Sequence, residues 1–307
     1  MEMYVQPEIQ HARLHPNVCP KESGNDYEFS PQLKATFDKD THTLWSYWTA
    51  EPRPCFNPGL LADLRGLYDF IGDSEGAIDC QNESTPLEYV VMASSMPGVF
   101  NLGGDLDLFK QLIAGKDRAG LVRYGRACID VLHLNYNSYN LPLTNIALVQ
   151  GECLGGGFEA ALSNDVIIAE KSARFGFPEV LFNLFPGMGA YSFLDRKIGR
   201  KGAEELITSG RIHDAQEMLD LGVIDVVAED GAGESTVHQY IRRRARSRNG
   251  LAALAAVRRR VHAITFEELL DVVQIWVDAA LRLTSRDLKL MQRLVSRQNS
   301  LEAAQVH

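Results

Sequence analysis

Hydrophobic and polar residues alternate between positions 33 and 50, and this period of two is typical of β-strands. Leucines at helical spacing then predict a helix over residues 58–72. Residues 87–94 are almost wholly apolar, which predicts a buried strand. By the same criteria we expect strands over 146–150 and 166–169, and helices over 106–114, 117–138 and 158–162.

Beyond residue 195 the apolar spacing is mostly helical, with one short strand over 223–227. The predicted helices cover residues 200–209, 214–221, 234–247, 251–261, 266–283 and 284–297. The first residues are polar and rich in proline, which favours a loosely ordered arm. We therefore expect an N-terminal arm (1–26), an α/β core (27–230) and a C-terminal helical region (231–307) that frays after residue 297.

The order strand, glycine-rich loop, helix occurs twice, near residues 87–114 and 146–163. Two such units in one core bring their glycine loops to the same edge of a sheet. The second loop holds three consecutive glycines, Gly155 to Gly157, whose amides a ligand can approach closely. Two carboxylates follow, at Glu159 and Glu179. Exposed amides with two carboxylates can polarise a carbonyl and move protons beside it.

Composition narrows the class of protein. The 307 residues are 45% hydrophobic and 23% charged, which is ordinary for a globular chain. A net charge of −9 argues against binding to nucleic acid or a membrane surface. Five scattered cysteines without CxxC spacing indicate reduced thiols, and the histidines show no metal spacing, so we expect neither a metal nor a cofactor. No basic or apolar leader and no long apolar run is present, so we expect a cytoplasmic protein.

Four motifs resemble the crotonase (enoyl-CoA hydratase/isomerase) superfamily. Residues 100–106 resemble its first oxyanion loop, a loop whose backbone amide binds a developing negative oxygen, and residues 147–162 resemble its second. Residues 175–190 and 210–225 are similar to two later blocks of the family, in the same order. The resemblance implies the α/β crotonase (ClpP/crotonase-like) spiral fold, with a C-terminal helical region used in oligomerisation.

A closer similarity is to the bacterial diffusible signal factor (DSF) synthases. It lies in residues 99–106, 155–163, 178–193 and 275–278. That family dehydrates a 3-hydroxyacyl thioester on acyl carrier protein and hydrolyses the thioester, giving cis-2-unsaturated fatty acids for quorum sensing. The resemblance implies an acyl carrier protein-bound substrate, a homo-oligomer (a trimer or a dimer of trimers), and capture by the receiver domain of a sensor kinase.

The family's functional residues carry over by position. Gly104 and Gly156 would give the two amides of the oxyanion hole, and Glu159 and Glu179 the acid/base pair. The expected substrate-binding residues are Leu102, Gly103, Gly155 and Trp276. The chemistry fits, because loss of the C2 proton of a thioester makes an enolate-like oxyanion that two amides stabilise. One carboxylate takes that proton while the other, protonated, protonates the departing C3 hydroxyl. Which glutamate is which stays open.

One departure from the family pattern concerns the carrier. Many members that use CoA carry a cation shortly after the first oxyanion glycine, where it contacts the CoA nucleotide. Here the third residue after Gly104 is Asp107, and a carboxylate repels phosphate. This favours acyl carrier protein. The alternatives are a general enoyl-CoA hydratase of fatty-acid metabolism and a crotonase-fold binding partner of a sensor kinase.

Two further features allow more than one interpretation. Eight arginines between residues 242 and 260 form a local basic surface, either on solvated helix faces with ion pairs or as a docking site for an acidic carrier protein. The apolar helix that contains Trp276 is either core or subunit interface, or part of a fatty-acyl pocket.

Overall fold

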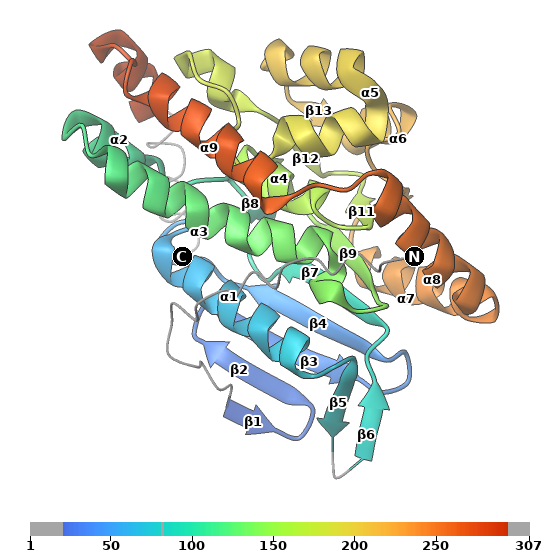
Figure 1. The fold of residues 1–307 in the computed structure, drawn as a ribbon. Coiled ribbons are helices and arrows are strands. Elements are labelled where there is room, and N and C mark those ends of the chain that lie inside the picture. Colours follow the sequence, from blue (N-terminus) through green and yellow to red (C-terminus); the bar gives the residue numbers. More distant parts are fainter. Residues whose placement is uncertain (1–20, 81–82, 294–307) are drawn as a thin grey trace, which may run out of the picture.

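Two β-sheets surrounded by helices make up the fold, which a computed structural model describes for residues 21–80 and 83–293 (Figure 1). The larger sheet has the strand order β1-β2-β3-β4-β7-β9-β11-β14. These strands are β1 (Lys21–Ser23), β2 (Asp26–Ser30), β3 (Leu33–Asp38), β4 (Thr43–Trp48), β7 (Tyr89–Ser94), β9 (Thr144–Val149), β11 (Val166–Glu170) and β14 (Val226–Ala228). The strands from β1 to β4 pair antiparallel, and those from β4 to β14 pair parallel.

The smaller sheet has the order β13-β12-β10-β8, and a separate hairpin pairs β5 with β6. Its strands are β8 (Val99–Asn101), β10 (Glu152–Leu154), β12 (Arg174–Gly176) and β13 (His213–Asp214), and those of the hairpin are β5 (Ala77–Cys80) and β6 (Glu83–Pro86). The α-helices are α1 (Pro58–Asp73), α2 (Leu106–Ala114), α3 (Arg118–Tyr136), α4 (Gly156–Leu162), α5 (Ala190–Ser209), α6 (Ala215–Asp220), α7 (Gly233–Arg244), α8 (Arg248–Val261) and α9 (Phe266–Ala280). Short 3₁₀ turns are η1 (Ser138–Asn140), η2 (Pro178–Phe182) and η3 (Ala245–Ser247).

The parallel strands at the centre of the large sheet are buried on both faces, which is why they read as continuous apolar runs. In β7, Val90 and Met92 belong to the main core, into which α1 and α3 also pack. The alternate residues Val91 and Ala93 belong to a second core on the opposite face. Helix α7 contributes Val237 and Ile241 to that second core. The large sheet therefore separates two layers of apolar side chains.

Each turn of the spiral adds a strand to the large sheet, then a strand to the small sheet, then a helix. The chain runs from β7 to β8 to α2, then from β9 to β10 to α4, and then from β11 to β12 to η2. Strands β8, β10 and β12 pair in parallel, so their carboxyl ends meet at one edge of the small sheet. A side chain at Gly151 is excluded, because a Cβ there would lie 2.2 Å from the carbonyl oxygen of Gly98. The turns that enter β8 and β10 thus pack directly on each other.

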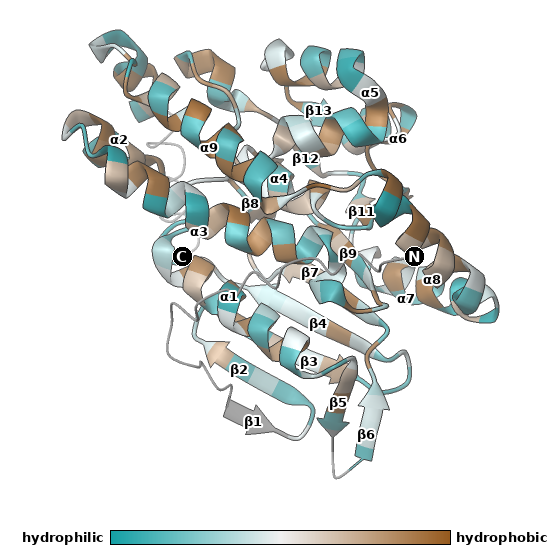
Figure 2. Cartoon of the chain, in the orientation of Figure 1, coloured by the Kyte–Doolittle hydropathy of each residue, from teal (hydrophilic) through white to brown (hydrophobic). Residues whose placement is uncertain are grey.

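Helices α3 and α9 lie side by side (Figure 1). Both carry hydrophobic and hydrophilic residues around their circumference, as expected of helices with one buried face (Figure 2). Their approach is close, because a Cβ on Gly125 would lie 2.6 Å from Cγ1 of Val273. This packing fixes the position of Trp276, one turn further along α9.

The helices predicted over residues 58–72, 106–114 and 117–138 are confirmed to within two residues as α1, α2 and α3. Helix α5 begins at Ala190, ten residues before the predicted start, and the strand predicted over 223–227 lies at Val226–Ala228. The prediction missed the small sheet, whose strands are too short to show a period. Strand β1 falls inside the predicted arm, while residues 1–20 and the predicted frayed end lie outside the described residues.

Part of the arginine cluster forms internal ion pairs. Arg248 pairs with Glu88, and both Arg258 and Arg259 pair with Asp165. These three side chains connect α8 to the rest of the fold, as in the first of the two interpretations above. Separately, no helix within the described ranges combines the length and apolarity that crossing a bilayer requires.

Trp48 gives a test of how the two sheets are connected. Its side chain is fully buried, its indole N–H donates to the Phe100 carbonyl at 2.8 Å, and its ring packs on Phe56 and Phe100. We expect Trp48→Ala to lower the free energy of unfolding by about 3–5 kcal/mol in urea denaturation. The control Ile275→Ala, at a 60% exposed position, should change it by less than about 1 kcal/mol. Equal effects would show that Trp48 does not connect the sheets.

Candidate active site

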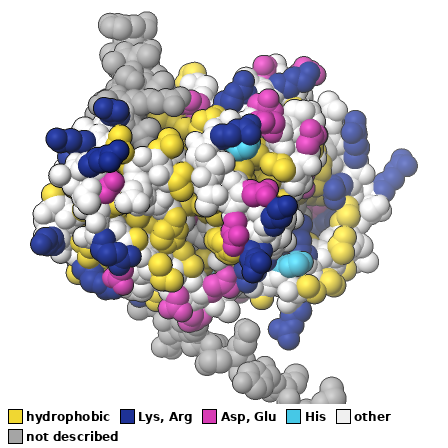
Figure 3. Space-filling model, turned by 90° about the horizontal axis from the view of Figure 1, so that it is seen from above, with side chains coloured by type: hydrophobic (Ala, Val, Ile, Leu, Met, Phe, Trp, Pro, Cys, Tyr) yellow, Lys and Arg dark blue, Asp and Glu magenta, His cyan; other side chains and the backbone are white. Residues whose placement is uncertain are grey.

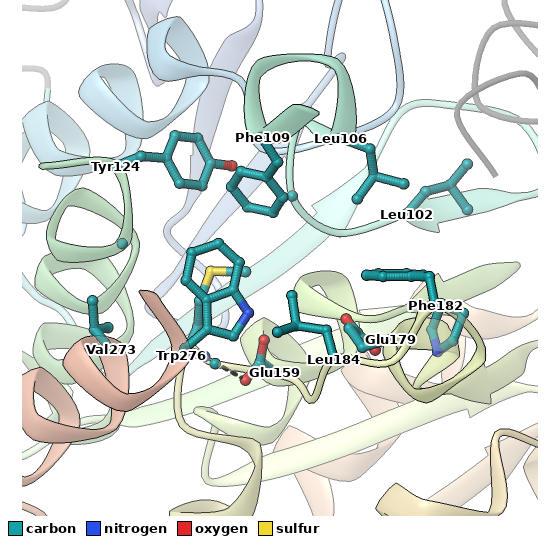
Figure 4. Close-up of a pocket in the computed structure, with 15 residues that line it drawn as sticks. Leu102, Leu106, Phe109, Tyr124, Glu159, Glu179, Phe182, Leu184, Val273 and Trp276 are labelled. Atoms are coloured by element: carbon teal, nitrogen blue, oxygen red, sulfur yellow. Dashed lines mark hydrogen bonds between the residues drawn. The ribbon is translucent and has the colours of Figure 1, made fainter. Parts of the chain in front are cut away.

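Three segments at the carboxyl ends of β8, β10 and β12 meet at a narrow cavity. Gly104 follows β8, Glu159 lies in the first turn of α4 directly after β10, and Glu179 lies in η2 after β12. The cavity has a volume of about 40 Å³. It is lined by Leu102, Gly104, Leu106, Phe109, Tyr124, Gly125, Glu159, Pro178, Glu179, Phe182, Leu184, Gly187, Met188, Val273 and Trp276. Glu159 and Glu179 lie along one side, with Phe109 and Leu106 opposite (Figure 4).

Glu159 is fully buried, and only one of its two carboxylate oxygens has hydrogen-bond partners among the described residues. Its Oε1 accepts hydrogen bonds from the backbone N–H groups of Met188 at 2.8 Å and Ala190 at 2.9 Å. Its Oε2 is buried with no partner among the described residues. Burial raises the pKa of Glu159 to about 7, although the two backbone hydrogen bonds act in the opposite direction. One carboxylate oxygen is therefore held in place and the other is available.

Glu179 also presents a buried Oε2 without a partner among the described residues. Burial is the main cause that raises the pKa of Glu179 to about 8, and repulsion from Glu159 adds to it. Charge on Glu159 thus makes ionisation of Glu179 harder. Near neutral pH this favours a state with one carboxylate and one protonated carboxyl group, which is what paired acid and base chemistry needs.

Gly155 makes room for Glu179. Its φ of +52° is rare for residues with a side chain, and a Cβ there would lie 2.5 Å from Oε1 of Glu179. In the structure Gly155 thus gives room to a carboxylate, and its predicted contact with substrate stays a prediction.

Gly103 brings the two glycine loops into contact. Its φ is +94°, and a Cβ there would lie 2.8 Å from the backbone nitrogen of Gly156. Its own N–H donates to Oδ1 of Asn101 at 2.8 Å, and that of Gly155 donates to the Gly176 carbonyl at 2.9 Å. Gly103, like Gly155 and Gly156, is not part of the cavity lining, and its predicted contact with substrate stays a prediction.

The amides of Gly104 and Gly156, in contrast, have no acceptor within the part of the chain that the structure describes. Gly156 begins α4, where the first N–H groups of a helix have no partner in the helix itself. A Cβ on Gly156 would lie 2.3 Å from Cε of Met188 and 3.4 Å from the nitrogen of Gly104. The two loops therefore bring two unused donors close together, one of them beneath a flexible methionine.

Met188 was not predicted and has two roles in the geometry. Its backbone N–H holds Glu159, and its side chain separates the cavity from a small void lined by Gly156. The only sequence signal was its place in the block at residues 175–190.

The opposite wall is aromatic and aliphatic. Trp276 packs against Phe109 with ring centroids 4.9 Å apart, and Phe109 packs edge-on against Tyr124 at the same distance. A Cβ on Gly187 would lie 2.3 Å from the Trp276 ring, so the indole sits directly on the backbone there. Trp276 and Leu102, both predicted to contact substrate, line this cavity. An apolar wall of this kind suits an acyl chain.

Asp107 is not a free carboxylate, which corrects the argument from sequence. The Arg53 guanidinium pairs with Asp107 through one nitrogen and with Asp105 through the other, the latter at 2.9 Å. Two carboxylates and one guanidinium leave one net negative charge beside the first loop. This net charge equals that of Asp107 alone, so the expected repulsion of a phosphate keeps its sign.

Metal-ligating side chains do not gather anywhere in residues 21–80 and 83–293, since no group of three or more His, Cys, Asp or Glu could hold an ion there.

Comparison with known proteins agrees with this geometry. The model of the enoyl-CoA hydratase/isomerase family matches residues 76–296, well over half of the chain. Mouse mitochondrial methylglutaconyl-CoA hydratase is 34% identical over 155 residues, which cover 50% of this chain and 46% of that protein. The human protein of that name is 33% identical over 153 residues, covering 50% and 43%. The match thus spans a little less than half the length of these relatives.

Solved structures show the same crotonase fold at low sequence identity. Pseudomonas aeruginosa DspI superposes with a TM-score of 0.64 at 22% identity, covering 76% of this chain and 88% of that one. Human mitochondrial delta3-delta2-enoyl-CoA isomerase gives 0.70 at 19% identity, covering 87% and 97%. Enoyl-CoA hydratase from Bacillus halodurans gives 0.70 at 20% identity, covering 85% and 99%. The expected α/β spiral with C-terminal helices is therefore confirmed.

The raised pKa of Glu179 predicts a pH dependence of stability. The folded protein holds this proton up to about pH 8, whereas the unfolded chain loses it near 4.3. Between these values ionisation favours unfolding, so this group makes the unfolding free energy of the wild type fall as pH rises. Glu179→Gln removes the effect. We expect the variant to gain stability relative to wild type from pH 5 to 8, by up to about 1.4 kcal/mol per unit of pKa shift. A constant difference in urea denaturation across this range would contradict the shift.

Proposed function

The chain belongs to the enoyl-CoA hydratase/isomerase family, and from this premise we propose a lyase that makes a fatty-acid signal of the DSF type. Its substrate is a 3-hydroxyacyl thioester on acyl carrier protein. Dehydration gives the 2-enoyl thioester, and hydrolysis of the thioester then releases a cis-2-unsaturated fatty acid. The observation that carries the dehydration is the pair of buried glutamates with raised pKa values beside two unused backbone donors.

The proposed dehydration uses these groups as follows. The thioester carbonyl oxygen lies between the N–H groups of Gly104 and Gly156. One glutamate takes the C2 proton, and the negative charge moves to that oxygen, where each donor is typically worth about 3–4 kcal/mol. The C3–O bond then breaks as the other glutamate gives its proton to the hydroxyl, which leaves as water. The pair ends with its single proton on the glutamate that took it from C2.

Hydrolysis uses the same groups. The carboxylate of the pair takes a proton from water, whose oxygen attacks the thioester carbon. The oxyanion again lies against the two amides. When the C–S bond breaks, the carrier thiol takes up a proton and the fatty acid is released.

Two features support acyl carrier protein over CoA. The Arg53, Asp105 and Asp107 group keeps one net negative charge beside the first loop, which disfavours the phosphates of a CoA nucleotide. The sequence blocks at residues 99–106, 155–163, 178–193 and 275–278 are similar to those of the DSF synthases.

The cavity of about 40 Å³ is far below the roughly 300 Å³ or more of small-molecule sites, so an acyl chain must displace side chains such as Met188.

The second candidate is a general hydratase that acts on enoyl-CoA. It is favoured by the names of the curated relatives and of the solved enoyl-CoA hydratases. Both candidates use the same glutamates, and they differ in carrier and in the hydrolysis step.

Self-association and capture by a receiver domain stay predictions from the family resemblance. Large hydrophobic side chains are exposed at Leu181 (56%), Ile212 (42%) and Leu221 (48%), which is compatible with a subunit interface. The face seen from above shows a band of hydrophobic side chains with charged ones spaced around it (Figure 3).

Replacing either glutamate tests the chemistry. We expect Glu159→Gln and Glu179→Gln each to lower turnover at least ~100-fold, because an amide neither takes nor gives the proton. Glu170→Gln is the matched control, since Glu170 is buried outside the cavity, where it accepts hydrogen bonds from Gln150 and Gly233. It should keep most of the activity. Wild-type turnover in the two cavity variants, measured by mass spectrometry on folded protein, would refute the assignment.

Substrate and product separate the candidates. We expect the purified protein to convert 3-hydroxydodecanoyl-acyl carrier protein to free cis-2-dodecenoic acid, and to act poorly on the CoA thioester. Mass spectrometry of both reactions decides the point. Reversible hydration of the CoA thioester without free acid supports the general hydratase instead. No turnover of either thioester supports the non-catalytic alternative, which a pull-down of receiver domains with a glutamate variant then tests.

A further inference from the structure

Tyr124 lies on α3, and its hydroxyl completes a short ladder beside the first oxyanion loop. The side chain is only 6% exposed. Two segments run parallel there: Leu102 N–H donates to the Pro54 carbonyl and Phe56 N–H donates to the Gly103 carbonyl, both at 2.8 Å. In such a parallel bridge, between Phe56 and Gly104, the next bond runs from the N–H of Asp105 to the carbonyl of Phe56.

The tyrosine hydroxyl bonds to both of these groups. Tyr124 Oη accepts a hydrogen bond from the Asp105 N–H at 3.2 Å and donates one to the Phe56 carbonyl. The peptide that carries the Gly104 N–H is held through the Gly103 carbonyl by the Phe56 N–H, and the hydroxyl holds the next peptide through the Asp105 N–H. Gly104 is thus restrained on both sides.

The ring of Tyr124 constrains the same loop from a second direction. It packs edge-on against Phe109, with an interplanar angle of 86°. The Phe109 ring in turn lies so close to Gly104 that a Cβ there would be 2.7 Å from it. The hydroxyl has two backbone partners, and the Cys128 thiol is a further hydrogen-bond partner. Burial raises the pKa of the Tyr124 phenol well above its usual range, so the phenol keeps the proton that it donates.

We propose that Tyr124 is a positioning residue for the oxyanion hole: its hydroxyl holds the peptide that follows Gly104 and so keeps the Gly104 N–H directed toward the thioester oxygen. This inference rests on the proposed function and deepens it. An oxyanion donor stabilises charge only when it is held in the productive direction before the reaction. Without the hydroxyl, the Asp105 N–H and the Phe56 carbonyl lose this shared partner. Gly104 is then restrained on one side only, through the bond to the Gly103 carbonyl, and its N–H is held less firmly.

The test uses Tyr124→Phe, which keeps the ring and removes the hydroxyl. The probe is the acetoacetyl thioester of pantetheine, because pantetheine is common to acyl carrier protein and CoA. Its enolate absorbs in the ultraviolet, so the pKa of the bound probe reports how well the site stabilises an oxyanion. We expect the wild type to lower that pKa and the variant to raise it again by about one unit or more. Dehydration kcat should fall roughly 10–100-fold, with KM changed less than about threefold.

Tyr139→Phe is the matched control. Tyr139 is 5% exposed, its hydroxyl donates to Oδ1 of Asn135 at 2.7 Å, and it does not line the cavity. Loss of this buried hydroxyl should lower stability to a similar extent. It should leave the pKa of the bound probe and kcat unchanged. A purely structural role of Tyr124 predicts that the two variants behave alike.

The outcomes separate the two proposals. Tyr124→Phe with wild-type probe pKa and kcat overturns the positioning role, and so does an equal effect of Tyr139→Phe. A wild type that does not lower the pKa of the probe overturns the oxyanion hole itself, before any variant is compared. Amide hydrogen exchange of residues 102–106 in the wild type needs no variant. Slow exchange at Asp105 supports the fixed loop, and exchange as fast as in an unstructured chain overturns it.

Discussion

The site depends on the direct approach of two backbone loops with no side chain between them. A Cβ on Gly103 would lie 2.8 Å from the nitrogen of Gly156, and one on Gly157 would lie 2.2 Å from the carbonyl oxygen of Asn101. Such spacing is reached only because β8 and β10 are neighbours in the small sheet and end at the same edge. The glycines are therefore a packing requirement of the sheet as much as a requirement of the chemistry. Widening either contact would separate the amides of Gly104 and Gly156.

The buried glutamates are the costly part of this arrangement, because a carboxylate loses its hydration when it is buried. The chain offsets part of the cost for Glu159 by aiming the Met188 and Ala190 N–H groups at one oxygen. The cost that is left appears as raised pKa values. This uncompensated loss of hydration brings the pKa values of the two glutamates near neutral pH, where a proton can move between carboxyl group and substrate. The burial that raises these pKa values, and so favours proton transfer, therefore lowers the stability of the fold.

The sequence was informative where residue type or spacing has one dominant physical cause. Consecutive glycines followed by Glu159 indicated close backbone approach and acid/base chemistry, and the long amphipathic helices were located to within a few residues. The small sheet could not be predicted, because a three-residue strand such as β10 has no period and is defined only by its partners. The close approach of Gly103 to Gly156 and of Gly155 to Glu179 is likewise a tertiary property, which the sequence does not show.

Asp107 shows why charge at a binding site has to be judged from pairs rather than from single residues. In sequence it is an isolated carboxylate, but Arg53, which lies 54 residues earlier, pairs with it and with Asp105. Asp105 also caps α2 by accepting from the Leu108 N–H at 3.1 Å, and its own N–H goes to Tyr124. One aspartate therefore links the ion pair, the helix start and the oxyanion loop. A substitution of Asp105 that is made to alter carrier preference would also move Gly104. Carrier preference and catalysis therefore cannot be varied independently at Asp105.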